Sequence, residues 1–475
     1  MSTQTQIISS NMDTEVSGPV VLSGSDKTVD QIRDSIDFTS ADNTEIKTAL
    51  EGFKAKELNG PAVDASTFIL PTVGPRLEAI AQNLHSGTGF SILRGFNTQK
   101  YTDEDNLIIF LGLGSYIGSQ RGAQNKSRVM ISHITDAKGW QDVPPEKRHG
   151  IHTNSALPFH TDMGCEVLTL LYRQVAAHGG ATSLASAAAI YDDLLKQPKI
   201  LETLQAANWP VQLSVKNPVF KEMPLLAHHE GHVISEIYTF AAFPIPNEYI
   251  TDIFPVSADP GRLGLHPATA EKPSEGSRLN EAQLKALKIL NDLAEKHAVS
   301  IPARPGDILF INNLAVLHKR DSYVDDDSDA DSDADADTKK TNGTAADEQV
   351  STSEADPKDS KDDPSAAESP IDSEHKDTPE KDDKAKAGGD KLPTADDTKR
   401  RWLMRLWLRN EKLGWKIPDA MKLPWEAAYG KDVGRLITPK YDPSPQPDYK
   451  EPRYTSGTAA WLIEDEDDEA WMHLG

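Results

Sequence analysis

The chain of 475 residues contains a single cysteine, Cys165. One thiol excludes an intramolecular disulfide and any zinc site built from several cysteines, and we expect it to be buried and inert. No apolar run approaches the roughly 20 residues that a membrane-spanning helix needs. The first residues, MSTQTQIISSNMDTEVSGP, lack both the basic start and the apolar core of a secretory signal. These absences predict a cytoplasmic protein with no membrane partner.

Basic residues are also scarce, with 50 Lys and Arg against 74 Asp and Glu and a net charge of −24. Binding to nucleic acid requires clustered basic side chains, so this balance argues against nucleic acid as a partner. Most of the excess lies in residues 325–398, where 25 acidic and nine basic residues give a net charge of −16. This stretch has almost no large apolar side chains to offset its ordering entropy, and we expect it to be disordered.

Composition therefore divides the chain into one globular domain and three segments that we expect to be flexible. They are a disordered N-terminal tail (1–28), a domain in two pieces (29–324 and 399–435), a disordered acidic insert (325–398) and a mobile C-terminal tail (436–475).

Local patterns predict the main elements of the domain. They are a helix, turn and strand over 74–96, a helix over 102–118, a buried strand over 166–176, a helix from Ser186, a helix over 280–298, a turn at 305–307 followed by a strand-like run into His318, and a strand over 399–410. Asn280 and Gln283 are placed to form a capping box on the helix over 280–298. In the last strand Arg401, Arg405 and Arg409 share one face, because alternate residues of a strand point the same way.

A histidine followed two residues later by an acid occurs three times, at His160/Asp162, His228/Glu230 and His375/Asp377. The third lies in the acidic insert, where no scaffold would fix it, and the second is typical of an exposed polar edge. A mononuclear iron(II) site uses two histidines and one carboxylate and leaves three positions open. His160 and Asp162 fit the local part of such a site, and His318 is the candidate third ligand.

Four segments carry a family resemblance: FHTD, GGAT, PGDILFINNLAVLHKRD and RRWLMRLWLRN. In this order, over residues 60–435, they resemble the TauD/TfdA (taurine dioxygenase and clavaminate synthase-like) family of Fe(II)- and 2-oxoglutarate-dependent dioxygenases, in particular its fungal members. The resemblance implies a mainly β fold, a double-stranded β-helix or jelly roll with flanking helices. It also implies that His160, Asp162 and His318 bind the iron.

The same resemblance implies a site for 2-oxoglutarate. Arg401, the first arginine of an R-x-x-x-R pair, matches the residue that binds the distal carboxylate, a task suited to a planar bidentate donor. Thr182 of the GGAT turn matches its hydroxyl partner, Arg405 faces the substrate, and Asn154 lies near the mouth of the site as a substrate contact. The acidic insert interrupts the family pattern between His318 and Arg401 and makes Arg400 a rival, although its opposite parity points it away from Arg405.

The implied function is oxidation, usually hydroxylation, of a small and possibly anionic substrate, such as a sulfonate or carboxylate, by O2 with release of succinate and CO2. One alternative is a catalytically silent relative that recruits partners through its acidic segments. Another is a cupin-like iron dioxygenase that needs no cosubstrate, which the Arg401 and Arg405 pair disfavours. The sequence carries no signal for the oligomeric state.

Overall fold

The computed structural model describes residues 35–124, 128–136, 150–212, 220–237, 279–325, 400–430 and 438–445. The α-helices are α1 (Ser40–Lys54), α2 (Val73–Ser86), α3 (Asp103–Ser115), α4 (Ala187–Leu194), α5 (Pro198–Gln205), α6 (Glu281–Lys296) and α7 (Lys422–Tyr429). Short 3-10 helices are η2 (Gly60–Ala62), η3 (Thr98–Lys100), η5 (Gly150–His152) and η7 (Asp419–Met421). No helix among these residues is long and apolar enough to cross a membrane.

The strands form two main sheets and three small pairs. The larger sheet has seven strands in the order β1 (Ser35–Asp37), β2 (Phe90–Arg94), β14 (Ile308–Asn312), β6 (Val167–Gln174), β17 (Trp402–Arg409) and β3 (Gln120–Arg121), with β4 (Ile131–Ile134) also paired to β17. The four-stranded sheet has the order β13 (Val299–Ile301), β8 (Thr182–Ser186), β15 (Val316–Arg320) and β5 (Leu157–His160). The small pairs are β9 (Trp209–Gln212) with β10 (Phe220–Met223), β11 (Leu226–His229) with β12 (His232–Ser235), and β7 (His178–Gly179) with β16 (Tyr323–Val324).

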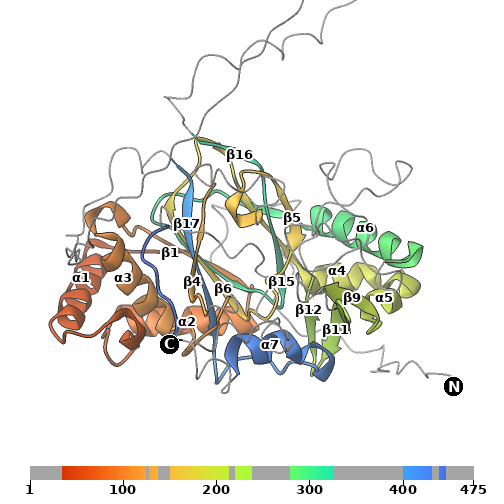
Figure 1. Ribbon diagram of the computed structural model, residues 1–475, viewed down its shortest axis with the longest axis horizontal. Coiled ribbons are helices and arrows are strands. Elements are labelled where there is room, and N and C mark those ends of the chain that lie inside the picture. Colours follow the sequence, from red (N-terminus) through yellow and green to blue (C-terminus); the bar gives the residue numbers. More distant parts are fainter. Residues whose placement is uncertain are drawn as a thin grey trace, which may run out of the picture. The chain divides into compact units, whose positions relative to one another are not determined.

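The two main sheets share one apolar core between their inner faces. Strand alternation produces it: Leu168 and Leu170 of β6 pack inward with Leu184 of β8, whereas Val167 and Leu171 pack outward. The outer face of the seven-stranded sheet is covered by α1, α2 and α3, and α4, α5 and α6 pack against the outer side of the four-stranded sheet (Figure 1). Side chains on the inner faces, including those of His318 and Arg401, therefore approach one another between the sheets.

The two facing sheets and the helices around them agree with the expected jelly roll with flanking helices, but the class is mixed α/β and not mainly β. Helices contribute about as many residues as strands, and the fold is mixed α/β. The reason is that each sheet has an apolar outer face as well as an apolar inner face, and a helical layer covers each outer face.

The run from the turn at 305–307 to His318 was expected to be one strand and is two, β14 and β15, in different sheets. β14 ends at Asn312, and the chain turns over residues 313–315 before β15 begins. Asn312 Oδ1 accepts from the Leu314 N–H (3.1 Å), a local bond that favours a turn over a continued strand. Asn313 Oδ1 accepts from the distant Asp162 N–H (2.8 Å) and so fixes the turn against the end of β5.

Two segment boundaries differ from the expected ones. Asp325, expected at the start of the insert, is buried, and its Oδ1 accepts from the Arg401 N–H at 2.8 Å. Within the expected C-terminal tail, residues 438–445 lie against the domain, where the Met130 N–H donates to the Lys440 carbonyl (2.9 Å). Residues 1–28, 326–398 and 446–475 lie outside the described residues.

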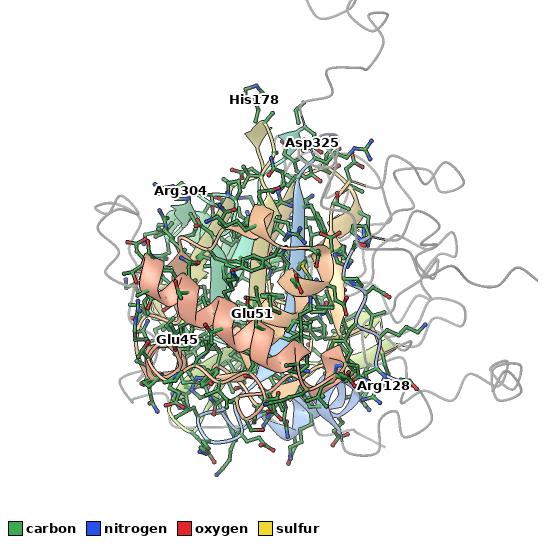
Figure 2. All side chains as sticks on the ribbon, turned by 90° about the vertical axis from the view of Figure 1, so that its left-hand side faces the viewer. Glu45, Glu51, Arg128, His178, Arg304 and Asp325 are labelled. Carbon is green, nitrogen blue, oxygen red and sulfur yellow. The ribbon has the colours of Figure 1, made fainter. Side chains whose placement is uncertain are left out.

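Asp325 and His178 lie at the same end of the domain (Figure 2). The pairing of β16 with β7 brings them there, because Val324 lies opposite His178. Asp325, the last described residue before the acidic insert, therefore lies beside the strand pair formed by β7 and β16.

Candidate metal centre

His160, Asp162 and His318 converge between the two sheets. His160 ends β5, His318 lies directly opposite it on β15, and Asp162 follows two residues after β5. The Nε2 atoms of both histidines are 3.8 Å from Asp162 Oδ1. One ligand atom from each residue lies within 4.8 Å of the others, and among the described residues this is the group that could hold a metal ion.

The protonation of these groups suits metal binding. His160 Nδ1 donates to the Pro158 carbonyl at 2.8 Å, which leaves the lone pair on Nε2. Burial lowers the pKa of both histidines, that of His318 to about 3, so both are neutral near pH 7. Burial would raise the pKa of Asp162, but Arg405 and the two histidines outweigh it and lower the pKa to about 2. Two neutral imidazoles and one carboxylate are the donor set of a facial iron(II) site.

The carboxylate of Asp162 is held by a shell of hydrogen bonds. Its Oδ2 accepts from Arg405 Nη1 and from Trp407 Nε1, both at 3.0 Å. Asn313 Nδ2 donates to the backbone carbonyls of Asp162 and Cys165, both at 2.8 Å. Because Oδ2 carries these bonds, Oδ1 is the oxygen that faces the histidines. Partners of this kind fix the orientation of a metal ligand.

Arg401 and Thr182 line the same small cavity, of about 40 Å³, as the three candidate ligands. Arg401 is only 2% exposed, and its Nη1 has no hydrogen-bond partner in the described part of the chain. Thr182 Oγ1 lies 2.8 Å from the Tyr172 hydroxyl. A buried, unpaired guanidinium N–H is costly and fits an anionic ligand such as a carboxylate.

The GGAT turn leaves room for Arg401. Gly180 has φ +71°, and a Cβ atom there would lie 3.1 Å from Arg401 Nε. A side chain at this position would be strained by the backbone and would crowd the guanidinium. The second glycine of the turn, Gly180, therefore leaves the space that the Arg401 side chain occupies.

The other predicted site residues lie as follows. Arg405 lines the cavity and bonds to Asp162, as well as to Gln124 Oε1 at 2.8 Å. Asn154 is exposed, and its carbonyl accepts from the Tyr323 N–H at 3.0 Å. The rival Arg400 is exposed, and His228 lies on β11, outside the metal group.

Sequence reasoning did not single out Asn313, Trp407 or Arg320. Asn313 and Trp407 hold Asp162, and Arg320 lines the cavity. A signal for Asn313 was available, because two adjacent asparagines stand inside the apolar run ILFINNLAVL, and buried amide side chains need hydrogen-bond partners. A signal for Arg320 was its position two residues after His318, on the same face of the strand.

Comparison with known proteins identifies the family. The model of the family described as taurine catabolism dioxygenase TauD, TfdA family matches residues 54–332. A taurine hydroxylase-like protein, SAT17, of Stachybotrys chartarum is 32% identical over 291 residues, covering 60% of this chain and 69% of that protein.

Two solved structures are similar at lower levels. An asparagine oxygenase in complex with Fe(II), 3-hydroxyasparagine and succinate has 10% identity and a TM-score of 0.46, covering 81% of this chain and 98% of the other. The non-heme iron oxygenase OrfP in complex with Fe and alpha-ketoglutaric acid has 12% identity and a TM-score of 0.44, covering 79% and 94%.

The family match covers more than half of the chain, and the His160, Asp162 and His318 group lies within the matched residues. The chain therefore belongs to the TauD/TfdA family and is a 2-oxoglutarate-dependent dioxygenase, an oxidoreductase.

Proposed function

We propose that the protein binds Fe(II) through His160, Asp162 and His318 and oxidises a C–H bond of a small anionic molecule. The observation that carries this proposal is the convergence of three deprotonated donors within 4.8 Å, next to a buried arginine with an unpaired N–H. In this family the bound iron couples O2 reduction to oxidative decarboxylation of 2-oxoglutarate, releasing succinate and CO2.

Arg401 and Thr182 are the proposed contacts of the cosubstrate's distal carboxylate. Arg401 supplies a fixed positive charge and a planar fork of donors in a site from which water is largely excluded. Thr182 supplies a hydroxyl whose orientation is fixed by Tyr172. The apolar wall of the cavity, formed by side chains such as Leu170 and Leu403, strengthens these electrostatic contacts by lowering the local dielectric.

The proposed substrate is a small sulfonate or carboxylate. Arg405 is a further cation that lines the cavity, and it is positioned beside the proposed iron ligand Asp162. The relative described as taurine hydroxylase-like supports a sulfonate in particular. Asn154, in the exposed loop before β5, is the proposed contact at the mouth of the site.

The triad is tested by anaerobic addition of Fe(II) and 2-oxoglutarate, which should produce a visible metal-to-ligand charge-transfer band. His160→Ala and His318→Ala should abolish the band, and His228→Ala, which changes a histidine outside the group, should retain it. Normal absorption in the first two variants would exclude this site. Absence of the band from the wild-type protein would favour the alternative of a catalytically silent interaction protein.

The substrate class is tested by measuring succinate release in the presence of sulfonates, carboxylates and amino acids. An anionic compound should stimulate release above the uncoupled rate. Stimulation by neutral or cationic compounds alone would contradict the proposed role of Arg405.

A further inference from the structure

A second buried arginine, Arg320, lines the cavity together with Arg401. Arg320 is 5% exposed, and its Nε and Nη1 have no hydrogen-bond partner among the described residues. The guanidinium carbons of Arg320 and Arg401 lie 5.2 Å and 5.1 Å from the centre of the Tyr323 ring. Both guanidinium groups therefore contact the same tyrosine ring and line the same cavity, and each has at least one N–H without a partner in the described part of the chain.

The position of Arg320 on β15 directs it into the site. It lies two residues after His318 and therefore on the same face of the strand. In the pairing of β15 with β8 it is directly opposite Thr182. Residues opposite each other in antiparallel strands have Cβ atoms roughly 5 Å apart and project to the same side. Arg320 thus approaches the proposed carboxylate site from the strand next to the threonine.

A structural role explains only one nitrogen of this side chain. Nη2 donates to the carbonyls of Gly150, Thr153 and Ser155, at 3.4 Å and 3.0 Å for the first two, and so holds the loop that leads into β5. Nε and Nη1 take no part in this contact, and neither has a hydrogen-bond partner in the described part of the chain. Leaving buried donors unpaired is costly unless a ligand satisfies them.

The electrostatics also favour an anion at this point. Burial and then the charge of Arg401 lower the pKa of Arg320, to about 10, so the side chain remains protonated at neutral pH. Tyr323 and the carboxylate of Asp136 oppose this shift and stabilise the cation in part. An anionic group in the cavity that both guanidiniums line would offset both their repulsion and their desolvation.

We propose that Arg320 is a second arginine for the distal carboxylate of 2-oxoglutarate and acts together with Arg401 and Thr182. This inference rests on the proposed function, because it assigns a residue to the same cosubstrate site. The carboxylate has two oxygens and about four acceptor positions, enough for both guanidiniums and the hydroxyl. Arg320 then links the bound cosubstrate to the loop before β5, and through it to the strand that ends at His160.

The test compares 2-oxoglutarate with 2-oxovalerate, in which a methyl group replaces the distal carboxylate. Dissociation constants are measured anaerobically with Fe(II) by titrating the charge-transfer band, and the thermal shift induced by each ligand is measured in parallel. In Arg320→Gln the affinity for 2-oxoglutarate should fall by about tenfold or more, the usual effect of losing a hydrogen bond to a charged group. The affinity for 2-oxovalerate should stay nearly unchanged, so the preference for 2-oxoglutarate should fall by the same factor.

Arg173→Gln is the matched control. Like Arg320, Arg173 is buried and has two nitrogens without a hydrogen-bond partner among the described residues, but it bonds to Asp103 and lies outside the cavity. It should leave the preference for 2-oxoglutarate as in the wild type. If Arg320→Gln does not fold, Arg320→Lys takes its place: it keeps one charge and loses the fork, so the preference should still fall severalfold.

An unchanged preference in a folded Arg320 variant would overturn the inference. So would an equal loss of affinity for both ligands, because that result would assign Arg320 to the loop alone. A wild-type protein that binds neither iron nor 2-oxoglutarate would overturn the proposed function and this inference together, and so the two failures are distinguishable.

Discussion

At the scale of single residues, the choice between Arg400 and Arg401 depends on which side of β17 each occupies. Arg401 is buried and shares its face with Leu403 and Trp407, which pack between the sheets, whereas Arg400 is exposed. Only the buried arginine lies in a low dielectric, where a charge-assisted bond to a carboxylate is strong.

Arg401→Lys should raise the 2-oxoglutarate requirement by about tenfold or more, because lysine keeps the charge but loses the bidentate fork. The affinity for Fe(II) should stay nearly the same, since Arg401 does not bond to a metal ligand. Succinate release as a function of 2-oxoglutarate concentration checks the first point, and Fe(II) titration checks the second. Arg400→Lys is the control, and impairment in that variant alone would assign the role to Arg400.

The buried carboxyl group of Glu236 should make the stability of the folded protein depend on pH. Burial raises its pKa to about 8 from an ordinary value of 4.5, although Trp425 Nε1 donates to its Oε1 at 2.9 Å. Between these two pH values the folded protein keeps a proton that the unfolded chain loses, so stability should fall as pH rises from about 5 to 8.

Glu236→Gln removes this titration and should raise the melting temperature at pH 8 more than at pH 5. The expected gain at pH 8 is on the order of a few kcal/mol. Melting curves across this pH range measure it, with Glu230→Gln as an exposed control. Equal shifts at both pH values would show that Glu236 does not titrate in this window.

The grouping of His160, Asp162 and His318 could be predicted from the sequence, because short family motifs carry these three residues. The contacts of Trp407 with Asp162 and of Gln124 with Arg405 could not be predicted in this way. Trp407 and Gln124 reach the site only because β17 pairs with β6 and Gln124 donates to the Arg405 carbonyl at 2.9 Å. Such contacts depend on strand order across hundreds of residues, and no local pattern encodes them.

At the scale of elements, helices with strong end signals were predictable. The helix expected over 280–298 is α6, and Asn280 and Gln283 form the capping box predicted for it. The sequence did not predict that β14 and β15 are two strands. The residues on both sides of the asparagines are equally apolar, so periodicity alone does not mark the turn between them. The local side-chain bond of Asn312 to the Leu314 N–H marks where the chain changes sheets.

Asn280→Ala should destabilise the protein by about 1 kcal/mol, since it removes the oxygen that accepts from the Gln283 N–H at 3.0 Å. Chemical denaturation measures the change. Asn59→Ala is the matched control, because Asn59 precedes η2 but makes no capping bond with its side chain. Equal effects of the two substitutions would mean that the capping bond contributes little.

At the scale of the whole molecule, the acidic insert separates two elements that both reach the candidate site. His318 lies before it and Arg401 after it, and a long insertion between two site residues would ordinarily disturb the geometry between them. The structure joins the two ends of the insertion instead. Asp325 accepts a hydrogen bond from the Arg401 N–H at 2.8 Å, and β16 is anchored to β7 just before this point.

We therefore predict that residues 327–398 can be replaced by a flexible linker of about ten residues without loss of Fe(II) or 2-oxoglutarate binding. The bond between Asp325 and Arg401 already closes the gap, and a short linker only has to span two adjacent points. Shortening a loop from about eighty to about ten residues is three halvings and lowers its closure entropy cost by roughly 2 kcal/mol. The melting temperature should therefore rise slightly or stay the same.

The effect of the segment's charge can be measured separately from the effect of its length. A second variant keeps the length of the segment but replaces every Asp with Asn and every Glu with Gln. The native segment carries most of the chain's net charge of −24, so both variants should capture an anionic substrate faster than the wild type at low salt. The difference should vanish near physiological ionic strength, where the screening length is about 8 Å. A folded deletion variant that binds iron but no longer binds 2-oxoglutarate would contradict the prediction and would assign the segment a direct part in the cosubstrate site.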